Sequence, residues 1–250
     1  MHIFVINLPE SSIRRAAIER QLVDLGLSFE VFPAIRGASL SNAEKSAVYD
    51  SKWFHRYQGR NIRPGELGCS LSHIAIYRMI VDKAIPHALV LEDDAWLNPN
   101  LPMLLRAIEE IYDSRDRNVF LLTWASSVYS SKLRNLWSSY HVAEVKSAVC
   151  THGYVISISA ARALLEALYP VAHIADAWNW IQRHGFVRVL AVIPTCITAD
   201  LLFGSDIYTD RNSVKSSNSF LGMVLHKVYR GIWQVLDLIR AGFRRTGIWR

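Results

Sequence analysis

The sequence predicts an α/β fold in which helices flank a mostly parallel β-sheet. The first observation is an apolar run at residues 2–8, followed by a helical pattern that ends near Leu25 and a second apolar run at 29–32. Strand, helix and strand in that order form a βαβ unit, whose strands are parallel by default. The second observation is an apolar run at residues 88–91, which is too short for a helix. The third is the alternation of strand-like and helix-like patterns up to residue 193.

Between the βαβ unit and residue 88, the sequence predicts two helices and a loop. Residues 41–49 form a short polar helix, and Pro64 starts a strong helix that runs over 67–83. Residues 53–62 are aromatic and basic without a clear period, which predicts a functional loop. Surface aromatic residues that pack under a loop would show the same pattern.

Beyond residue 94, strands and helices continue to alternate. Ser159 is expected to cap a helix at 160–168, and residues 126–140 are expected to form a long loop rich in serine and tyrosine. Residues 200–212 look irregular. The other elements expected are a helix at 99–112 and strands at 119–124, 141–149, 154–158 and 186–193.

The composition indicates one large globular domain, or one domain with an appendage. The chain has 250 residues, of which 51% are apolar and 20% charged. Its three cysteines, Cys69, Cys150 and Cys196, lack the spacing of a zinc site or a disulfide framework and fit a reducing compartment. No basic segment precedes the first apolar run, so we expect no signal peptide. No apolar window has the length of a transmembrane helix.

The net charge of +6 is a property of the end of the chain. Residues 215–250 hold seven basic residues and one acidic residue, Asp237, so residues 1–214 are balanced. This distribution argues against a nucleic-acid groove across the body of the protein. We therefore predict a folded domain at 1–214 and a basic tail at 215–250.

The tail has the pattern of an amphipathic helix. Apolar residues recur at steps of three and four over 220–245, with basic residues on the opposite side and with Trp233 and Trp249 nearby. Such a helix is typical of a membrane interface. A terminal helix that packs on the core would show the same spacing, but the unopposed positive charge favours the membrane.

Three carboxylates, Glu92, Asp93 and Asp94, follow the apolar run at 88–91. Like charges held together at the end of a buried strand raise one another's energy, so the arrangement does not serve stability. Hard cations such as Mg²⁺ or Mn²⁺ take carboxylate, phosphate and water oxygens as ligands. In open α/β sheets, ligands sit beyond the carboxyl ends of the strands. The triplet therefore predicts a metal site, whereas a solvated acidic turn is the alternative.

Other candidates are less specific. The first strand is not followed by a Gly-x-Gly-x-x-Gly motif, which argues against a dinucleotide site of that type. Arg14 and Arg15 lie one turn into the first helix, where they could meet a diphosphate or lie on a solvated surface. Cys69 and His73 are four apart on one helix face, but two ligands are too few for zinc. We expect both to be core residues or to support the site from behind.

Seven blocks spread over residues 2–207 together resemble glycosyltransferase family 25, the lipooligosaccharide β-galactosyltransferase family that also includes collagen galactosyltransferase domains. The most specific is the Gly-Glu-x-Gly-Cys-x-x-Ser-His pattern at 65–73, followed by Glu-Asp-Asp. The blocks are residues 4–8 with Arg14 and Arg15, 33–37, 65–73, 89–94, 151–157, 175–178 and 205–207.

The resemblance implies a GT-A type fold, with a Rossmann-like sheet that binds a nucleotide sugar. Glu92, Asp93 and Asp94 would stand where such enzymes keep a DxD metal motif, although the triplet is not a literal DxD. The resemblance also implies inversion at the anomeric carbon, galactose as the transferred sugar and a lipooligosaccharide-type acceptor. The segment 126–140 and the tail lie outside the matching blocks, so acceptor choice is not carried over.

We expect Asp94, together with Glu92 or Asp93, to hold Mn²⁺ or Mg²⁺, because a divalent ion neutralises the leaving diphosphate. Asp176 is the candidate general base that accepts the proton of the acceptor hydroxyl, and it lies beside Trp178 and Trp180, which could stack on sugars. An aspartate that only begins a helix near aromatic residues would show the same sequence pattern. The residues expected to contact the donor or to line its pocket are Asn7, Leu8, Arg14, Glu66, His73 and Asp93.

The predicted function is therefore metal-dependent, inverting transfer of a hexose from a UDP-sugar to a lipid-linked glycan. The tail places such an enzyme on the cytoplasmic face of a bacterial inner membrane as a peripheral protein. A non-catalytic, membrane-associated scaffold is the competing function. Phosphoryl transfer is disfavoured because no Walker-type loop is present.

Overall fold

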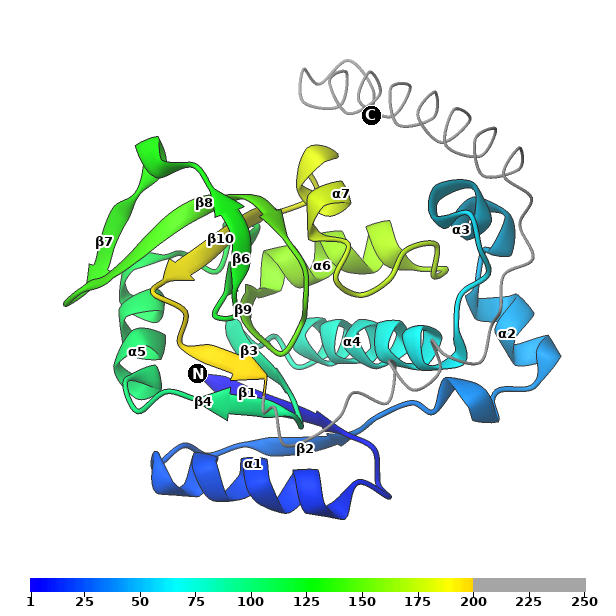
Figure 1. Cartoon of the computed structure of the whole chain (residues 1–250), viewed down its shortest axis with the longest axis horizontal. Helices are drawn as coiled ribbons and strands as arrows, with labels where there is room; N and C mark the ends of the chain where they lie inside the picture. The colour runs from blue at the N-terminus through cyan, green and yellow to red at the C-terminus, as the bar shows by residue number, and fades with distance from the viewer. Residues whose placement is uncertain (200–250) are drawn as a thin grey trace.

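A computed structural model describes residues 1–199, which form a nine-stranded mixed sheet with helices on both faces (Figure 1). Eight strands follow the order β2-β1-β3-β9-β5-β10-β8-β6, and β7 pairs with β8. The strands are β1 (His2–Asn7), β2 (Glu30–Pro33), β3 (His87–Glu92), β5 (Asn118–Leu121), β6 (Ala125–Val128), β7 (Arg134–Trp137), β8 (Tyr140–Ala148), β9 (Gly153–Ser157) and β10 (Arg188–Ile193). A second, two-stranded sheet pairs β4 (Ala95–Leu97) with β11 (Ile197–Ala199).

The helices connect and cover these strands. The α-helices are α1 (Ser12–Asp24), α2 (Asn42–Val48), α3 (Ser51–Gln58), α4 (Pro64–Asp82), α5 (Leu101–Ile111), α6 (Ile158–Leu168) and α7 (Trp178–Arg183), and short 3₁₀ turns are η1 (Gly37–Ser39) and η2 (Ser130–Lys132).

The strand directions confirm the mostly parallel α/β sheet that the sequence predicted. β1 pairs in parallel with both β2 and β3, and β5 pairs in parallel with β10. β9 runs antiparallel between β3 and β5, and β8 runs antiparallel to β10. The carboxyl ends of β1 and β3 therefore meet at one edge, which is where the acidic triplet lies.

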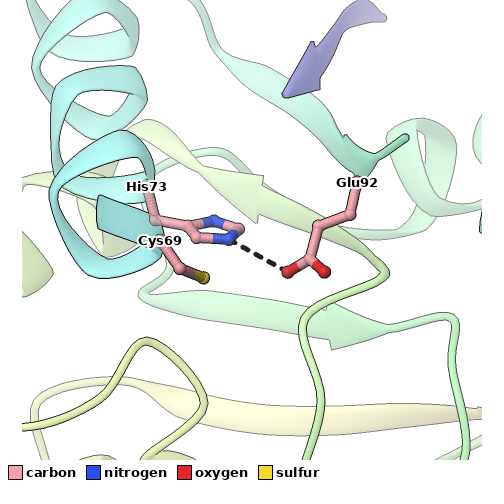
Figure 2. Close-up of side chains that lie close together, drawn as sticks. All are labelled: Cys69, His73 and Glu92. Carbon is pink, nitrogen blue, oxygen red and sulfur yellow. Dashed lines mark hydrogen bonds and ion pairs between the residues drawn. The ribbon is translucent and has the colours of Figure 1, made fainter. Parts of the chain in front are cut away.

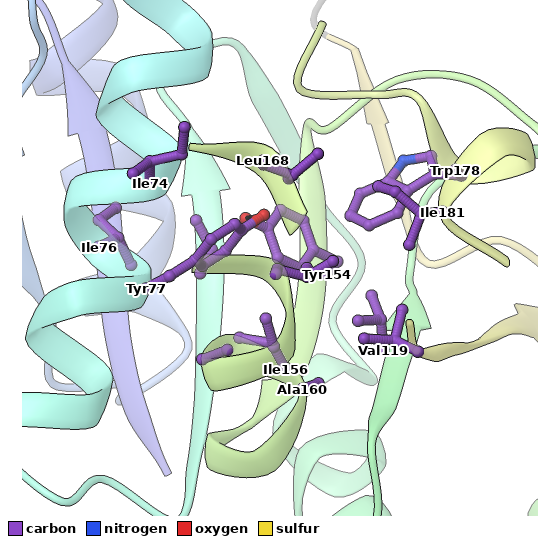
Figure 3. Packing of buried hydrophobic residues seen from close by; sticks show 14 of the residues in the cluster. Ile74, Ile76, Tyr77, Val119, Tyr154, Ile156, Ala160, Leu168, Trp178 and Ile181 are labelled. Carbon is purple, nitrogen blue, oxygen red and sulfur yellow. Dashed lines mark hydrogen bonds between the residues drawn. The ribbon is translucent and has the colours of Figure 1, made fainter. Parts of the chain in front are cut away.

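Alternation along the strands sends side chains into two separate cores. Phe4 of β1 and Val90 of β3 belong to the core under α4 and α6, whereas Val5 and Leu89 belong to the core under α1 and α5. Side chains of successive strand residues point to opposite faces, so a sheet covered on both sides reads as an unbroken apolar run. Figure 3 shows the first core, where Tyr77 of α4 lies toward β9 and α6.

α4 approaches the segment around η1 very closely, and two glycines make this possible. A Cβ on Gly37 would collide with the carbonyl oxygen of Pro64, and a Cβ on Gly68 would collide with that of Ile35. Ser72 Oγ accepts a hydrogen bond of 2.8 Å from the backbone nitrogen of Ile35. The start of α4 and the segment after β2 are thereby held together beside the ends of β1 and β3.

Two segments that the sequence presented as loops are regular structure. Residues 51–58 form α3, because Asp50 caps the helix start, accepting from the Trp53 nitrogen at 2.9 Å, and Gly59 ends it with a φ of 69°. Only Phe54 of this helix is buried, so its apolar period was too short to recognise. Residues 126–140 contain most of β6 and all of β7, which pair with β8 and are set by that partner rather than by their own polar composition.

The helix predicted at 160–168 is confirmed as α6, but its cap was wrong. Ser157, not Ser159, accepts the hydrogen bond from the Ala160 nitrogen, at 3.1 Å. Both serines have suitable side chains, and the position of the last residue of β9 decides between them. The other predicted helices and strands up to residue 193 are present to within a few residues at each end.

The predicted domain boundary at residue 214, the basic tail and the irregular segment at 200–212 lie outside the described residues. Within residues 1–199, no helix combines the length and the apolar character needed to cross a membrane.

Candidate active site at the ends of β1 and β3

A cavity of about 450 Å³ opens where β1 and β3 end and α4 begins. Its walls come from the first turn after β1, the segment around η1, the start of α4 and the residues after β3. Of the predicted site residues, Leu8, Arg14, His73, Glu92, Asp93 and Asp94 line this cavity. This is the position at which open α/β sheets bind ligands.

Asp93 is held by protein groups. Asn7 Nδ2 donates a hydrogen bond of 2.7 Å to Asp93 Oδ2, and Arg14 Nη1 lies 3.6 Å from Asp93 Oδ1. Burial raises the pKa of Asp93, whereas these two partners oppose the rise. Both oxygens of Asp93 are thus occupied, so this carboxylate is the least suited of the three to hold a cation.

Glu92 lies between two polar groups from distant parts of the chain. Thr151 Oγ1 donates a hydrogen bond to Glu92 Oε1, and His73 Nε2 lies 3.3 Å from the same oxygen. His73 Nδ1 lies 2.7 Å from the hydroxyl of Tyr154, and that hydroxyl lies 2.9 Å from the Tyr77 hydroxyl. Burial raises the pKa of Glu92, but His73, His152 and Thr151 together outweigh burial and hold the pKa well below its usual range.

Asp94 has a carboxylate oxygen that is available to a ligand, as far as residues 1–199 show. Its Oδ1 atom is buried and accepts no hydrogen bond from residues 1–199, while its Oδ2 atom lies 3.9 Å from His152 Nε2. Burial raises the pKa of Asp94, and the charge of Glu92 raises it further. Ionised Asp94 is therefore a destabilised anion that a cation would stabilise.

The residues present fit a hard divalent cation. Glu92, Asp94 and His152 each offer a ligand atom, and these atoms lie within 4.8 Å of one another. Two carboxylates and an imidazole suit Mn²⁺ or Mg²⁺, with room left for phosphate oxygens in the cavity. A hydrogen bond with Cys150 and the charges of Glu92 and Asp94 raise the pKa of His152 to about 9, although burial opposes this. The two carboxylates thus favour a positive charge on His152.

Three of the predicted site residues lie outside the cavity lining. Asn7 is buried beneath it and acts through Asp93. Glu66 is buried in the first turn of α4. Arg60 donates two hydrogen bonds of 2.7 Å to its carboxylate, and the Arg63 backbone nitrogen donates a third of 3.0 Å. A direct donor contact by Glu66 stays a prediction.

Asp176 is the third predicted site residue outside the cavity lining, although its charge interacts with those of Cys69 and Glu92. Its Oδ2 atom accepts a hydrogen bond of 3.1 Å from the Cys150 nitrogen, and Cys150 accepts one of 2.9 Å from Trp178 Nε1 through its carbonyl oxygen. Burial raises the pKa of Asp176, and the charge of Glu92 adds to the rise. Its role as general base stays a prediction.

His152 and Thr151 belong to the site, although the sequence did not single them out for a role. They arrive on the segment between β8 and β9, and the Glu92 nitrogen donates a hydrogen bond of 3.0 Å to the His152 carbonyl oxygen. The available signal was a Thr-His pair directly before the apolar run at 153–157.

The chain is similar to a known protein family and to proteins named after it. The family model described as "Glycosyltransferase family 25 (LPS biosynthesis protein)" matches residues 1–178. Procollagen galactosyltransferase 1 of Danio rerio is 27% identical over 172 residues, which are 66% of this chain and 28% of that protein. A glycosyltransferase 25 family member of Drosophila melanogaster is 37% identical over 100 residues, which are 39% of this chain and 16% of that protein.

Among solved structures, a glycosyltransferase involved in the glycosylation of the major capsid of PBCV-1 matches with a TM-score of 0.32 and 14% identity. The match covers 66% of this chain and 61% of that chain. The chain spans less than a third of the curated relatives named above. The family model, in contrast, covers most of the chain, including every residue of the cavity. The chain therefore belongs to glycosyltransferase family 25.

Proposed function

We propose that this chain transfers a hexose from a UDP-sugar to a hydroxyl group of a glycan acceptor, with inversion at the anomeric carbon. The observation that carries the proposal is the convergence of Glu92, Asp94 and His152, of which Glu92 and Asp94 line the cavity at the ends of β1 and β3. A half-buried cluster of this kind, at a cavity that Arg14 also lines, provides for a cation and for a diphosphate in one place. Membership of the family supports the reaction class.

Glu92 and Asp94, with His152 as a third ligand, would hold Mn²⁺ or Mg²⁺. When bound, such an ion supplies positive charge to the leaving diphosphate. Arg14 contributes a guanidinium that can contact a phosphate from the opposite wall of the cavity, and Asn7 keeps Asp93 turned toward Arg14. Leu8 offers an apolar contact to the nucleoside at the cavity wall.

In the transfer step, the acceptor oxygen forms a bond to the anomeric carbon while the bond to the UDP oxygen breaks. UDP leaves with the electron pair, and the proton of the acceptor hydroxyl passes to a base. Asp176 is our candidate base, because its burial keeps its pKa raised, nearer the operating pH than that of an exposed aspartate. The hydrogen bond from the Cys150 nitrogen orients the carboxylate.

We propose galactose as the transferred sugar, because the relatives are named for galactosyl transfer. Those names also specify procollagen, but the chain matches only a part of each such protein. For the acceptor we propose a lipid-linked glycan of the lipooligosaccharide type. The basic, amphipathic pattern of residues 220–245 and the family description support this choice, with the protein on the cytoplasmic face of a membrane.

The test is hydrolysis and transfer with a panel of UDP-sugars, measured as UDP release with and without Mn²⁺. We expect release from UDP-galactose that requires the ion and is lost in Asp94→Asn. The matched control is Asp113→Asn, which changes an exposed aspartate paired with Arg115 and should keep wild-type rates. A folded protein without release from any UDP-sugar would support the competing function of a non-catalytic scaffold.

A further inference from the structure

Cys69, His73 and Glu92 form a second group of metal-ligating atoms beside the carboxylate site. Their Sγ, imidazole nitrogen and carboxylate oxygen lie within 4.8 Å of one another. Figure 2 shows the three side chains converging, two from α4 and one from the end of β3. Cys69 and His73 share one helix face, and β3 supplies the third ligand that the sequence left missing.

The spacing of the His73 and Glu92 ligand atoms, which hydrogen-bond in the metal-free protein, also fits a shared cation. His73 Nε2 and Glu92 Oε1 are 3.3 Å apart, which is long for an N–H···O bond. Two ligand atoms that are each about 2.0–2.1 Å from a tetrahedral ion lie about 3.3 Å apart. The observed separation is the one that co-ligation requires.

Hydrogen bonds with neighbouring side chains orient both His73 and Glu92. His73 is buried, and its Nδ1 atom lies 2.7 Å from the Tyr154 hydroxyl, which leaves Nε2 as the atom that faces Glu92. Thr151 donates to Glu92 Oε1 and also hydrogen-bonds with the side chain of Cys69. Partners of this kind hold metal ligands in position in known sites.

We propose that Cys69, His73 and Glu92 bind a thiophilic divalent ion such as Zn²⁺. A thiolate, an imidazole and a carboxylate are a zinc donor set, and the cavity supplies an open fourth position. The thiol of Cys69 releases its proton to solvent when the sulfur–metal bond forms. Because Glu92 belongs to both groups, a bound Zn²⁺ competes with Mn²⁺ or Mg²⁺ for this carboxylate.

The test uses the metal alone and the full chain. Metal-free protein is titrated with Co²⁺, whose tetrahedral thiolate complexes show a sulfur-to-cobalt charge-transfer absorption in the near ultraviolet. We expect one equivalent to bind with this absorption and one equivalent of Zn²⁺ to bleach it. Cys69→Ser should remove the absorption and weaken Zn²⁺ binding. Loss of a group that only hydrogen-bonds to a metal ligand lowers metal affinity by roughly 10–100-fold, and loss of the ligand itself should lower it by at least as much.

The matched control is Cys150→Ser, because Cys150 is the other half-buried thiol near the site. It should keep the absorption. Loss of the absorption in Cys150→Ser but not in Cys69→Ser, or its absence from the wild type, would overturn the proposal.

A second measurement uses the wild type and so avoids any folding defect of a variant. Zn²⁺ should protect Cys69 from alkylation by iodoacetamide, which peptide mass spectrometry measures. Equal labelling with and without Zn²⁺ would also overturn the proposal. None of these readouts depends on sugar transfer.

Discussion

Asn7 Nδ2 donates a 2.7 Å hydrogen bond to Asp93 Oδ2 and so joins the end of β1 to the residue after β3. Asn7 is buried, and its amide also donates to the Ser11 carbonyl oxygen at 3.2 Å. The bond directs Asp93 toward Arg14 and away from Asp94. We therefore propose different tasks for the three consecutive acids: Asp93 orders the cavity wall, whereas Glu92 and Asp94 bind a cation.

Asp94→Asn should abolish ion-dependent stabilisation without unfolding the protein. Because burial raises the pKa of Asp94, its charge destabilises the metal-free fold at neutral pH, and the variant should unfold at an equal or higher temperature. Mn²⁺ at roughly 100 times its Kd should add about 2.7 kcal/mol to the wild type and nothing to the variant. Thermal unfolding with and without Mn²⁺ measures this. An equal Mn²⁺ shift in both proteins would remove Asp94 from the metal site.

Asp93→Asn should be the milder of the two substitutions. An amide can still accept from Asn7, so we expect Mn²⁺ stabilisation to be retained while donor affinity falls through the weakened contact with Arg14. Titration calorimetry with UDP and Mn²⁺ separates the two effects. The assignment of distinct tasks to the two aspartates fails if Asp93→Asn loses Mn²⁺ binding and Asp94→Asn keeps it.

Asp176→Asn should lower turnover by about 10²–10⁴-fold, the usual contribution of a positioned base. Asparagine can still accept from the Cys150 nitrogen, so the local structure should be kept. Initial rates over a range of donor concentrations give kcat and KM separately, and KM for the donor should change little. A collapse of donor affinity with kcat unchanged would assign Asp176 to binding instead.

Glu66→Gln should reduce the free energy of unfolding by about 1–3 kcal/mol, because a buried acceptor of charged hydrogen bonds from Arg60 is lost. The control is Glu19→Gln, which removes an exposed pair with Arg15 and should cost about 0.5 kcal/mol or less. Urea unfolding measures both. An unchanged stability together with a tenfold or larger rise in donor KM would support the direct donor contact instead (about 1.4 kcal/mol in binding).

His173 should make the fold sensitive to acid. Burial between aromatic rings lowers its pKa to about 3, and its Nε2 atom has no hydrogen-bond partner among residues 1–199. The unfolded chain binds a proton below about pH 6.5 and the folded chain does not, so stability falls as the pH drops from about 6.5 toward 3. His173→Phe should remove up to about 1.4 kcal/mol per pH unit of this slope. Parallel stability curves for both proteins between about pH 7 and pH 5 would contradict the assignment.

The membrane association that we propose would depend on residues 215–250, which lie outside the described residues. Serine at Lys227, Arg230, Arg244 and Arg245 in the full chain should weaken binding to anionic vesicles by about 1 kcal/mol for each residue. Vesicle co-sedimentation measures this, and neutral vesicles are the control. Unchanged binding to anionic vesicles would refute an electrostatic role of the tail.

Much of the fold was predictable because it depends on neighbours in sequence. The apolar runs of β1 and β3 and the helical patterns of α1 and α4 can be recognised from the local sequence, and the βαβ unit then sets the strand direction. The sequence did not predict α3, because a single buried phenylalanine does not produce the repeating apolar spacing of a helix. β6 and β7 were missed because polar strands form only where β8 offers a hydrogen-bonding partner.

Local sequence was enough to place three carboxylates at the end of a buried strand, and so to predict a cation there. It could not say which of them are free to bind it, because that depends on groups brought in by packing. Asn7 and Arg14 occupy Asp93, while Thr151 and His152 reach Glu92 and Asp94 from the segment before the neighbouring strand β9. Hydrogen bonds and charges act over a few ångströms of space whatever the separation along the chain, so the roles within the triplet follow from the tertiary fold.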